Sequence, residues 1–231
     1  GWPWTEESSH LPDKMDDGSD WPRISIVTPS YNQGMYIEET IRSVLLQGYP
    51  NLEYIIIDGG STDNTLDIIK KYEKWLAFWV SELDTGQSNA INKGIKQSSG
   101  KIIGWINSDD VYCQDAFKFV SEMMYSHKKI VTDVLYGNCI VIDENGIELS
   151  VTYGKPNTHD DIIKIWKGNY GVPQPGLFIS GDLFRNTLLD ENLHYVLDWE
   201  LMVRISQKAS LDYFNNNIAK YPIEFAKYML L

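Results

Sequence analysis

The sequence has little positive charge, few cysteines and no long apolar run, and each shortage excludes a class of protein. Its 231 residues carry 20 Lys and Arg against 32 Asp and Glu, a formal net charge of −12. Binding nucleic-acid phosphates requires a basic face, so the sequence argues against a nucleic-acid partner. No run approaches the roughly 18 apolar residues of a transmembrane helix. Two cysteines, Cys113 and Cys139, are too few for a disulfide framework or a cysteine zinc site, which favours a reducing cytoplasmic setting.

What is present points to a globular protein with a distinct first segment. Hydrophobic residues make up 43% of the chain, enough to build a core, so wholesale disorder is excluded. Residues 1–22 contain three prolines, three tryptophans and six acidic residues against one lysine, without an apolar repeat. We predict an extended acidic arm there, anchored on the body by Trp2, Trp4 and Trp21. Its first residues lack the basic and apolar regions of a signal peptide.

From residue 23 onward, short β-branched segments alternate with amphipathic ones. Continuous apolar strands between helices are typical of a parallel sheet that is covered on both faces. The fold class is therefore α/β, with a Rossmann-like, mostly parallel central sheet flanked by helices, and the second half is mixed. The expected strands cover 24–28, 54–57, 78–80, 101–106, 134–136 and 140–142, and the expected helices cover 35–46, 88–97, 160–167, 198–208 and a segment capped by 61–64.

Acidic residues follow the predicted parallel strands. Asp58 ends the second strand, Asp84 comes just after the third, and the pair Asp109-Asp110 follows the fourth. Ligands of such sheets bind beyond the carboxyl ends of the strands, so these carboxylates are expected to converge on one crevice. Crowded carboxylates repel one another unless a cation or a donor-rich ligand lies between them. A hard divalent metal with a phosphate-containing ligand fits that requirement.

Each acidic residue also has an ordinary structural interpretation. A single Asp after a strand is commonly a turn former or a helix cap, and this interpretation holds for Asp58 and for Asp63 when each is taken alone. The adjacent pair Asp109-Asp110 is harder to explain in that way, because surface solvation does not require two carboxylates directly after a buried strand. From spacing alone, a structural and a functional role for the pair remain equally supported.

Four sequence blocks now carry a resemblance to a known family. Their order and spacing agree over about residues 23–111, and more loosely to about residue 208. The chain resembles the family 2 glycosyltransferases, which have the GT-A fold. The blocks are Thr28-Pro29-Ser30-Tyr31-Asn32-Gln33, Asp58-Gly59-Gly60-Ser61-Thr62-Asp63, Asp84-Thr85-Gly86-Gln87-Ser88 with Asn92-Lys93-Gly94, and Asn107-Ser108-Asp109-Asp110.

The resemblance also implies how the chain is divided. Residues 23–111 would form the nucleotide-sugar-binding half of one GT-A domain. Residues 112–231 would form its acceptor-binding and catalytic half, with a smaller mixed sheet on the acceptor side. The chain ends at Leu231, which is consistent with truncation of a longer protein.

The resemblance implies roles in donor binding for the matching residues. Pro29 and Tyr31 would border the nucleotide base, with Tyr31 stacking on it. The implied cofactor is a divalent metal, Mg²⁺ or Mn²⁺, which bridges the diphosphate. The other roles are Asp58 for the base, Asp109 for the ribose hydroxyls, Asp110 for the metal, and Asp84 and Lys93 for the pocket around the nucleotide and diphosphate. For Lys93, a solvated helix position is an equally good interpretation.

The resemblance further implies a catalytic carboxylate in the second half. Asp198 matches the general base that removes the proton of the acceptor hydroxyl, and Glu200 is its alternative. Taken alone, Asp198 is better explained as a carboxylate at a helix N-terminus. Gln174 and Trp199 are candidates for contact with the donor sugar or acceptor, although Gln174 also fits an ordinary loop position.

The sequence therefore predicts a metal-dependent inverting glycosyltransferase that uses a nucleotide sugar, most simply a UDP-sugar. The implied acceptor is a glycan or glycolipid in bacterial surface polysaccharide or glycolipid synthesis. The implied location is cytoplasmic, with peripheral attachment to the inner face of the plasma membrane left open, as is the oligomeric state. One alternative is a noncatalytic nucleotide-sugar-binding module. A sugar-phosphate nucleotidylyltransferase is less well supported, because it requires a Gly-rich basic loop after the first strand and Tyr31-Asn32-Gln33-Gly34 does not provide one.

Two features depart from the family pattern. Asn89 stands where many relatives have Asp, which removes a charge from the expected pocket rim. The segment Tyr221-Pro222-Ile223-Glu224 stands where an Arg-x-His segment is expected after the last strand. The family often places that His near the metal or diphosphate, so this part of the site has no predicted equivalent.

Overall fold

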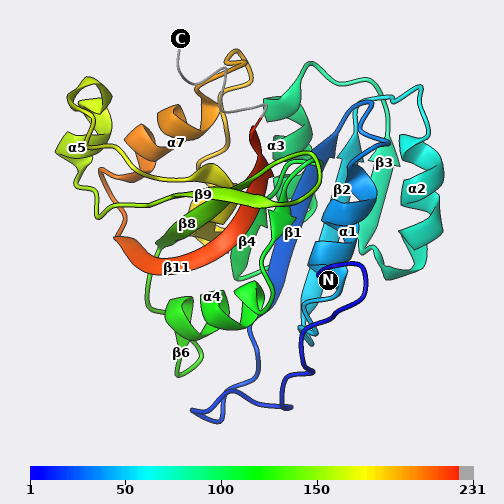
Figure 1. Cartoon of the computed structure of the whole chain (residues 1–231). Helices are drawn as coiled ribbons and strands as arrows, with labels where there is room; N and C mark the ends of the chain where they lie inside the picture. Colours follow the sequence, from blue (N-terminus) through cyan, green and yellow to red (C-terminus); the bar gives the residue numbers. More distant parts are fainter. Residues whose placement is uncertain (224–231) are drawn as a thin grey trace.

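The structure, a computed structural model, describes residues 1–223 and is built around one large twisted sheet (Figure 1). The strand order in this nine-stranded sheet is β3-β2-β1-β4-β10-β8-β11-β5, with β9 pairing to β8. The first four strands in that order are parallel to one another. This confirms the predicted α/β class. The strands are β1 (Ile24–Ser30), β2 (Leu52–Asp58), β3 (Phe78–Ser81), β4 (Ile102–Trp105), β5 (Val111–Tyr112), β8 (Val134–Ile142), β9 (Glu148–Thr152), β10 (Leu177–Ser180) and β11 (Leu211–Pro222).

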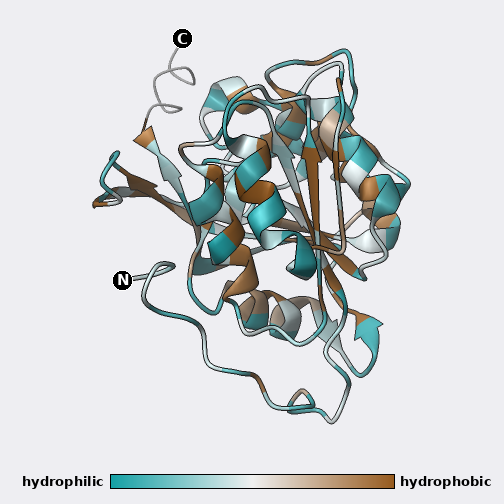
Figure 2. Ribbon diagram, turned by 90° about the vertical axis from the view of Figure 1, so that its right-hand side faces the viewer, coloured by the Kyte–Doolittle hydropathy of each residue, from teal (hydrophilic) through white to brown (hydrophobic). Residues whose placement is uncertain are grey.

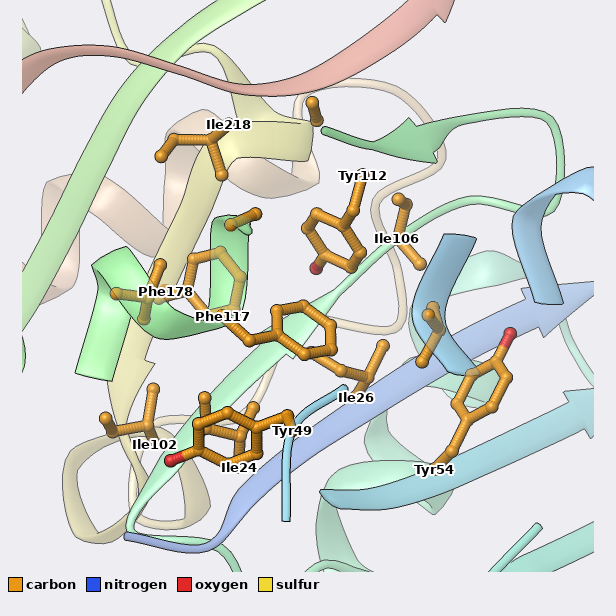
Figure 3. Packing of buried hydrophobic residues seen from close by; sticks show 14 of the residues in the cluster. Ile24, Ile26, Tyr49, Tyr54, Ile102, Ile106, Tyr112, Phe117, Phe178 and Ile218 are labelled. Carbon is orange, nitrogen blue, oxygen red and sulfur yellow. The ribbon is translucent and has the colours of Figure 1, made fainter. Parts of the chain in front are cut away.

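Alternation along the buried strands divides the core into two layers. Ile24 and Ile26 of β1 belong to one apolar cluster, whereas Val27 belongs to the other. The first cluster also holds apolar residues of α1 (Ile37–Leu45), α2 (Thr65–Tyr72) and α4 (Ala116–Met124), and Figure 3 shows its packing. The second cluster holds residues of α3 (Gln87–Gln97), α5 (His159–Ile163), α6 (Gly181–Arg185) and α7 (Leu197–Ile205). Apolar strands thus lie between helices whose polar sides face outward (Figure 2).

The second half differs from the sequence prediction in its connections. The strands expected at 134–136 and 140–142 are one continuous strand, β8, and β11 pairs with it in parallel. The mixed part is continuous with the central sheet, because β10 pairs antiparallel with both β4 and β8 and so joins the two halves. A small separate sheet consists of β6 (Tyr125–Ser126) and β7 (Lys129–Ile130). The helix expected at 160–167 is α5 followed by a 3₁₀ turn, Ile165–Lys167.

The first 23 residues contain no helix or strand and lie against the body as an arm. Trp2 donates its indole N–H to the Tyr112 carbonyl at 2.8 Å, and Trp21 donates to the Pro12 carbonyl at 2.7 Å. Trp4 is half exposed, and its ring lies 5.2 Å from the Arg42 guanidinium carbon. Trp2 and Trp4 thus contact the body of the molecule, and Trp21, whose indole bond lies within the arm, packs with its ring centroid 5.7 Å from that of Tyr49. Among the described residues, no helix is both long and apolar enough to cross a membrane.

Close packing of α3 on β1 explains why glycine stands at residue 94, and it leads to a prediction about stability. A Cβ at this buried position of α3 would lie 2.3 Å from a methyl of Val27 on β1. Replacing Gly94 with Ala is therefore expected to lower the free energy of unfolding by about 1–3 kcal/mol, because α3 must move away from the sheet. Urea unfolding measures the change. Gln97→Ala, at an exposed position of the same helix, is the control, and an equal effect of both substitutions would contradict the prediction.

Candidate active site

A cavity of about 490 Å³ opens at the carboxyl edge of the parallel strands. Its walls come from the segments that follow β1, β2, β3 and β4, where the sequence placed the acidic residues. The cavity thus lies at the edge of the sheet where the acidic residues were expected to converge, and Asp84 and Asp109 line it. The lining residues are Pro29, Ser30, Tyr31, Gln33, Gly59, Leu83, Asp84, Gly86, Gln87, Ala90, Asn107, Ser108 and Asp109.

An exposed aromatic side chain forms one wall of the cavity. Tyr31 is 59% exposed and directly follows Ser30, the last residue of the buried strand β1. The loop that carries it is fixed by hydrogen bonds to the loop after β2. Asn32 receives a hydrogen bond from the Thr62 N–H at 2.9 Å, and its own N–H donates to the Ser61 hydroxyl at 2.8 Å. Tyr31 therefore has an exposed ring on a backbone that hydrogen bonds hold in place, which suits stacking against a planar ring.

Asp58 does not line the cavity. Its side chain is fully buried at the end of β2, and its carboxylate accepts hydrogen bonds from the Gly60 and Ser61 N–H groups and from the Ser61 and Ser81 hydroxyls. These bonds shape the loop that presents Gly59 to the cavity. The turn-forming interpretation of Asp58 therefore describes its geometry, and its contact with the nucleotide base stays a prediction.

Asp84 is the carboxylate that faces the cavity from this side. It lines the wall, and its Oδ1 accepts the Gly86 N–H at 2.9 Å, which holds the turn before α3. Its Oδ2 would lie 2.7 Å from a Cβ at Gly59, so a side chain at residue 59 would push the Asp84 carboxylate out of its present position. The absence of a side chain at residue 59 thus leaves the Asp84 carboxylate open toward the cavity.

The pair Asp109-Asp110 divides into one cavity-lining and one buried carboxyl group. Asp109 lines the cavity, and partial burial raises the pKa of its carboxyl. Asp110 is only 3% exposed and does not line the cavity. Burial, together with the neighbouring Asp109 charge, raises the pKa of Asp110 well above its ordinary value, and its Oδ2 has no hydrogen-bond partner among the described residues. The family resemblance implies Asp110 as the metal ligand, whereas Asp109 is the carboxylate of the pair that lines the cavity.

The buried Asp110 carboxyl makes stability depend on pH. Because its pKa is raised in the folded state, the folded chain holds more protons than the unfolded chain above the ordinary Asp pKa, and stability falls as pH rises. Replacing Asp110 with Asn is therefore expected to raise the free energy of unfolding by about 1–3 kcal/mol at pH 7.5, and by less at pH 4.5. Urea unfolding at both pH values measures this. The control is Asp67→Asn at an exposed position, and an equal gain at both pH values would contradict the prediction.

A chain of side-chain amides joins the cavity to the second half of the molecule. Gln87 donates to Asn107 at 2.7 Å, Asn107 donates to Gln174 at 3.4 Å, and Gln174 donates to the Trp105 carbonyl at 3.1 Å. Gln174 therefore lies next to a cavity residue, as a role in contacting the donor sugar would require. Gln87 and Asn107 line the cavity but received no role in the sequence analysis, although both lie within the matching blocks.

Asp198 lies in the first turn of α7, outside the cavity lining. Burial raises the pKa of its carboxyl, although the Trp199 backbone N–H opposes the shift. Its charge also contributes to the raised pKa of Tyr170, whose hydroxyl is buried and has no hydrogen-bond partner among the described residues. A carboxylate with a raised pKa is a stronger proton acceptor near neutral pH, which suits a general base.

The other residues named from the sequence are engaged elsewhere. Lys93 forms an ion pair with Glu82 at 2.7 Å and does not line the cavity. Trp199 donates its indole N–H to the Ile162 carbonyl at 2.8 Å and packs against the second core cluster, so it joins α7 to α5. Glu200 forms two hydrogen bonds with Arg204, at 2.5 and 2.6 Å. These contacts are structural, and none of the three residues reaches the described cavity.

The described residues offer few ligands for a divalent metal. No group of three or more His, Cys, Asp or Glu side chains in residues 1–223 is arranged to hold a metal ion. The cavity nevertheless offers the Asp109 carboxylate and the Asn107 amide oxygen, which are hard oxygen ligands. This small donor set fits a cation that takes its remaining ligands from a bound diphosphate and water, and it does not fit a cation held by protein alone.

Comparisons with known proteins identify the family. The family model described as glycosyl transferase family 2 matches residues 25–179, which include every cavity residue. The chain belongs to glycosyl transferase family 2. Among curated relatives, TuaG of Bacillus subtilis (strain 168), a glycosyltransferase whose name refers to teichuronic acid biosynthesis, is 33% identical over 148 residues, covering 62% of this chain and 58% of its own. The uncharacterized glycosyltransferase RP339 of Rickettsia prowazekii (strain Madrid E) is 29% identical, covering 85% and 62%.

Solved structures of other proteins have the same fold as this family 2 chain. TarS residues 1–349 from S. aureus superpose with a TM-score of 0.70 at 21% identity, covering 90% of this chain and 63% of that one. The mannosyltransferase PcManGT from Pyrobaculum calidifontis gives a TM-score of 0.64 at 15% identity, covering 94% and 61%. At these identities the likeness confirms the GT-A fold. The chain spans about three fifths of the length of the two curated relatives.

The structure describes Asn89 and Tyr221, which belong to the two departures from the family 2 pattern. Asn89 does not line the cavity and instead donates its amide to the Glu191 carboxylate at 2.7 Å, a bond that an Asp could not donate. Tyr221 lies near the end of the pairing of β11 with β8, and its hydroxyl lies 2.6 Å from that of Thr152. Glu224 lies outside the described residues. Within residues 1–223, the cavity lining contains no histidine.

Proposed function

We propose that this chain transfers a sugar from a nucleotide-diphosphate donor, a UDP-sugar, to an acceptor hydroxyl. The observation that carries the proposal is the cavity in which exposed Tyr31 lies together with the carboxylates of Asp84 and Asp109. An aromatic platform suits a nucleobase, and a carboxylate in the same cavity suits a cation-bound diphosphate. TarS structures in complex with UDP and with UDP-GlcNAc, and PcManGT with GDP-Man and Mn²⁺, support a donor of this class.

Within that cavity, the roles predicted from the sequence are redistributed. Tyr31 and Pro29 bind the base, and Asp84 accepts a hydrogen bond from the base or ribose in place of buried Asp58. Asp109, with the Asn107 side chain, holds the divalent metal in place of buried Asp110. The metal, Mn²⁺ or Mg²⁺, supplies positive charge that stabilises the diphosphate as it leaves.

The acceptor side of the proposal rests on α7. Asp198 removes the proton of the attacking hydroxyl, and its raised pKa favours that transfer. A single displacement inverts the anomeric configuration. Gln174 contacts the transferred sugar in this proposal, and its hydrogen bond with cavity residue Asn107 supports that role. The name of TuaG supports an acceptor in surface polysaccharide synthesis, either a glycan or a glycolipid.

Ligand binding tests the proposal before any acceptor is known. UDP with Mn²⁺ is expected to raise the melting temperature, because a ligand at 100 times its Kd adds about 2.7 kcal/mol to the free energy of unfolding. Calorimetry with UDP, GDP and ATP, each with and without Mn²⁺, measures the preference. Tyr31→Ala should weaken UDP binding about 10-fold or more, since base stacking contributes about 1–3 kcal/mol, whereas Tyr195→Ala, at an exposed position outside the cavity, is the control.

Turnover then distinguishes transfer from binding alone. Release of UDP from UDP-GlcNAc, with and without a panel of glycan acceptors, is expected from the wild-type chain in Mn²⁺. Tight UDP binding without turnover on any UDP-sugar would instead favour a noncatalytic binding module. No stabilisation by any nucleoside diphosphate would contradict the proposed function altogether.

A further inference from the structure

Helix α3 serves two regions of the molecule at once. Gln87 and Ala90 in its first turn line the cavity, together with Gly86 directly before the helix. The helix also contacts residues 188–196, the segment that leads directly into α7 and Asp198. Helix α3 therefore forms part of the cavity wall and also contacts the segment that leads into α7, the helix of the candidate base.

The contact between α3 and this segment is a ladder of hydrogen bonds. Asn92 is 2% exposed; its amide donates to the Leu189 carbonyl at 2.9 Å, and its oxygen accepts the Leu189 N–H at 2.9 Å. Further along, the Ser88 hydroxyl donates to the Leu193 carbonyl at 3.2 Å. At the helix start, the His194 ring would lie 3.5 Å from a Cβ at Gly86. The segment thus follows α3 from its middle to the cavity edge.

Glu191 brings a negative charge into this ladder. Its two carboxylate oxygens are each bound by a different amide: Asn89 donates to Oε2 at 2.7 Å and Asn92 donates to Oε1 at 2.9 Å. These bonds lower the pKa of Glu191, with Asn92 as the larger cause, so the carboxylate is ionised at neutral pH. We call Asn89, Asn92 and Glu191 the α3 latch.

The other end of the segment is tied to α7 itself. Arg204 donates to the Leu188 carbonyl at 2.9 Å while its guanidinium is held by Glu200. This gives Glu200, the alternative base of the sequence analysis, a different task. The segment between Leu188 and Leu197 is therefore fixed on α3 at one side and on α7 at the other.

We infer that Glu191 is a positioning residue for sugar transfer: its carboxylate, bound by Asn89 and Asn92, sets Asp198 relative to the donor cavity. The inference rests on the proposed function of Asp198. It explains why Asn rather than Asp stands at residue 89, because a second carboxylate there would face Glu191 at hydrogen-bond distance and repel it. Misplacement of a reacting group by about 1 Å costs up to about 100-fold in rate, so a small opening of the latch is enough to slow transfer.

Three variants test the latch by reciprocal exchange. Asn89→Asp places two carboxylates face to face and is expected to lower kcat about 10-fold or more. Glu191→Gln should also lower kcat, although by less, because its new amide has one oxygen to accept from Asn92 and the Asn89 amide must turn before it can accept from the new N–H. In the double variant Asn89→Asp/Glu191→Gln, the new carboxylate at residue 89 accepts from the new amide at residue 191. The oxygen of that amide accepts from Asn92, so kcat should return toward the wild-type value.

Two further readouts separate positioning from general damage. The Kd of UDP with Mn²⁺ should be the same for all four chains, because the cavity side of α3 is unchanged. Hydrogen exchange of the amides in residues 190–200 should be faster in Asn89→Asp alone. Normal kcat in Asn89→Asp, failure of the double variant to recover, or a parallel loss of UDP affinity would each overturn the inference.

The assay uses UDP-GlcNAc as donor and the wild-type chain as reference. Absence of UDP release by the wild-type chain on any UDP-sugar would overturn the proposed function and, with it, the catalytic part of the inference. The exchange measurement would still decide whether Glu191 fixes the segment. A failure of the latch and a failure of the proposed function are therefore distinguishable.

Discussion

Replacing Asp198 with Asn is expected to lower kcat for sugar transfer by about 10²–10⁴-fold, the contribution of a positioned general base. The substitution keeps the size of the side chain and removes its capacity to accept a proton. UDP affinity in Mn²⁺ should be unchanged, because Asp198 does not line the donor cavity. Steady-state kinetics with UDP-GlcNAc, together with calorimetry for UDP, measures both quantities.

The pH profile of the wild-type chain provides a second check on Asp198. Because burial raises the pKa of this carboxyl, the ionised base form appears only above the ordinary Asp range. The rate should therefore be low below that raised pKa and rise to a plateau above it. The residual activity of Asp198→Asn should lack this rise.

Glu200→Gln is the matched control for the base. Glu200 lies two residues further along α7 and is paired with Arg204. Its substitution should weaken the contact to Leu188 and affect kcat much less than Asp198→Asn does. A larger loss in Glu200→Gln than in Asp198→Asn, or an unchanged rate in both, would refute the assignment of the base.

Replacing Asp109 with Asn should remove the response of the protein to Mn²⁺. In the wild-type chain, Mn²⁺ is expected to increase UDP affinity and to be required for transfer, since the cavity carboxylates would otherwise repel a diphosphate. Without the Asp109 carboxylate, UDP affinity should be the same with Mn²⁺ as with EDTA. Transfer should fall by about 10²–10³-fold, the usual loss when one group that stabilises transition-state charge is removed.

Asp110→Asn is the control that decides between the two adjacent carboxyls. Asp110 is buried behind the cavity wall, so its variant should keep the Mn²⁺-dependent gain in UDP affinity. Calorimetry of both variants with UDP, in Mn²⁺ and in EDTA, makes the comparison. If Asp110→Asn alone loses the gain, the metal belongs to Asp110 as the sequence predicted, and the redistribution of roles proposed for the cavity is incorrect.

Much of the first half could be predicted because its structure is local. Ile24, Ile26 and Val27 form a nearly continuous apolar run typical of a buried strand, and the helical spacing of Ile37, Ile41 and Val44 gives α1 directly. The second half could not be predicted in the same way. The parallel pairing of β8 with β11 joins residues about 80 positions apart, and the exposed polar run Asn215-Asn216-Asn217 interrupts the apolar pattern of β11.

Side-chain direction explains the differences within the site. Asp109 and Asp110 are neighbours in the chain, yet one lines the cavity and the other is buried. Asp58 and Asp84 both follow strands, yet the first is enclosed by its own loop. Trp199 is adjacent to the candidate base on α7, and its side chain is directed to the Ile162 carbonyl. Adjacent residues on a strand end or helix point in different directions, and sequence spacing does not say which one faces a ligand.

The sequence by itself determined the fold class, and it predicted the edge of the sheet at which the candidate site lies and the kinds of side chain that line it. It did so because parallel strands bring their carboxyl ends to one edge, wherever the rest of the chain runs. Only the tertiary structure decided which carboxylates face the cavity, and it alone joined α3 to the segment before Asp198 through Glu191. Those contacts link residues about 100 positions apart, and they depend on how the helices pack on the sheet.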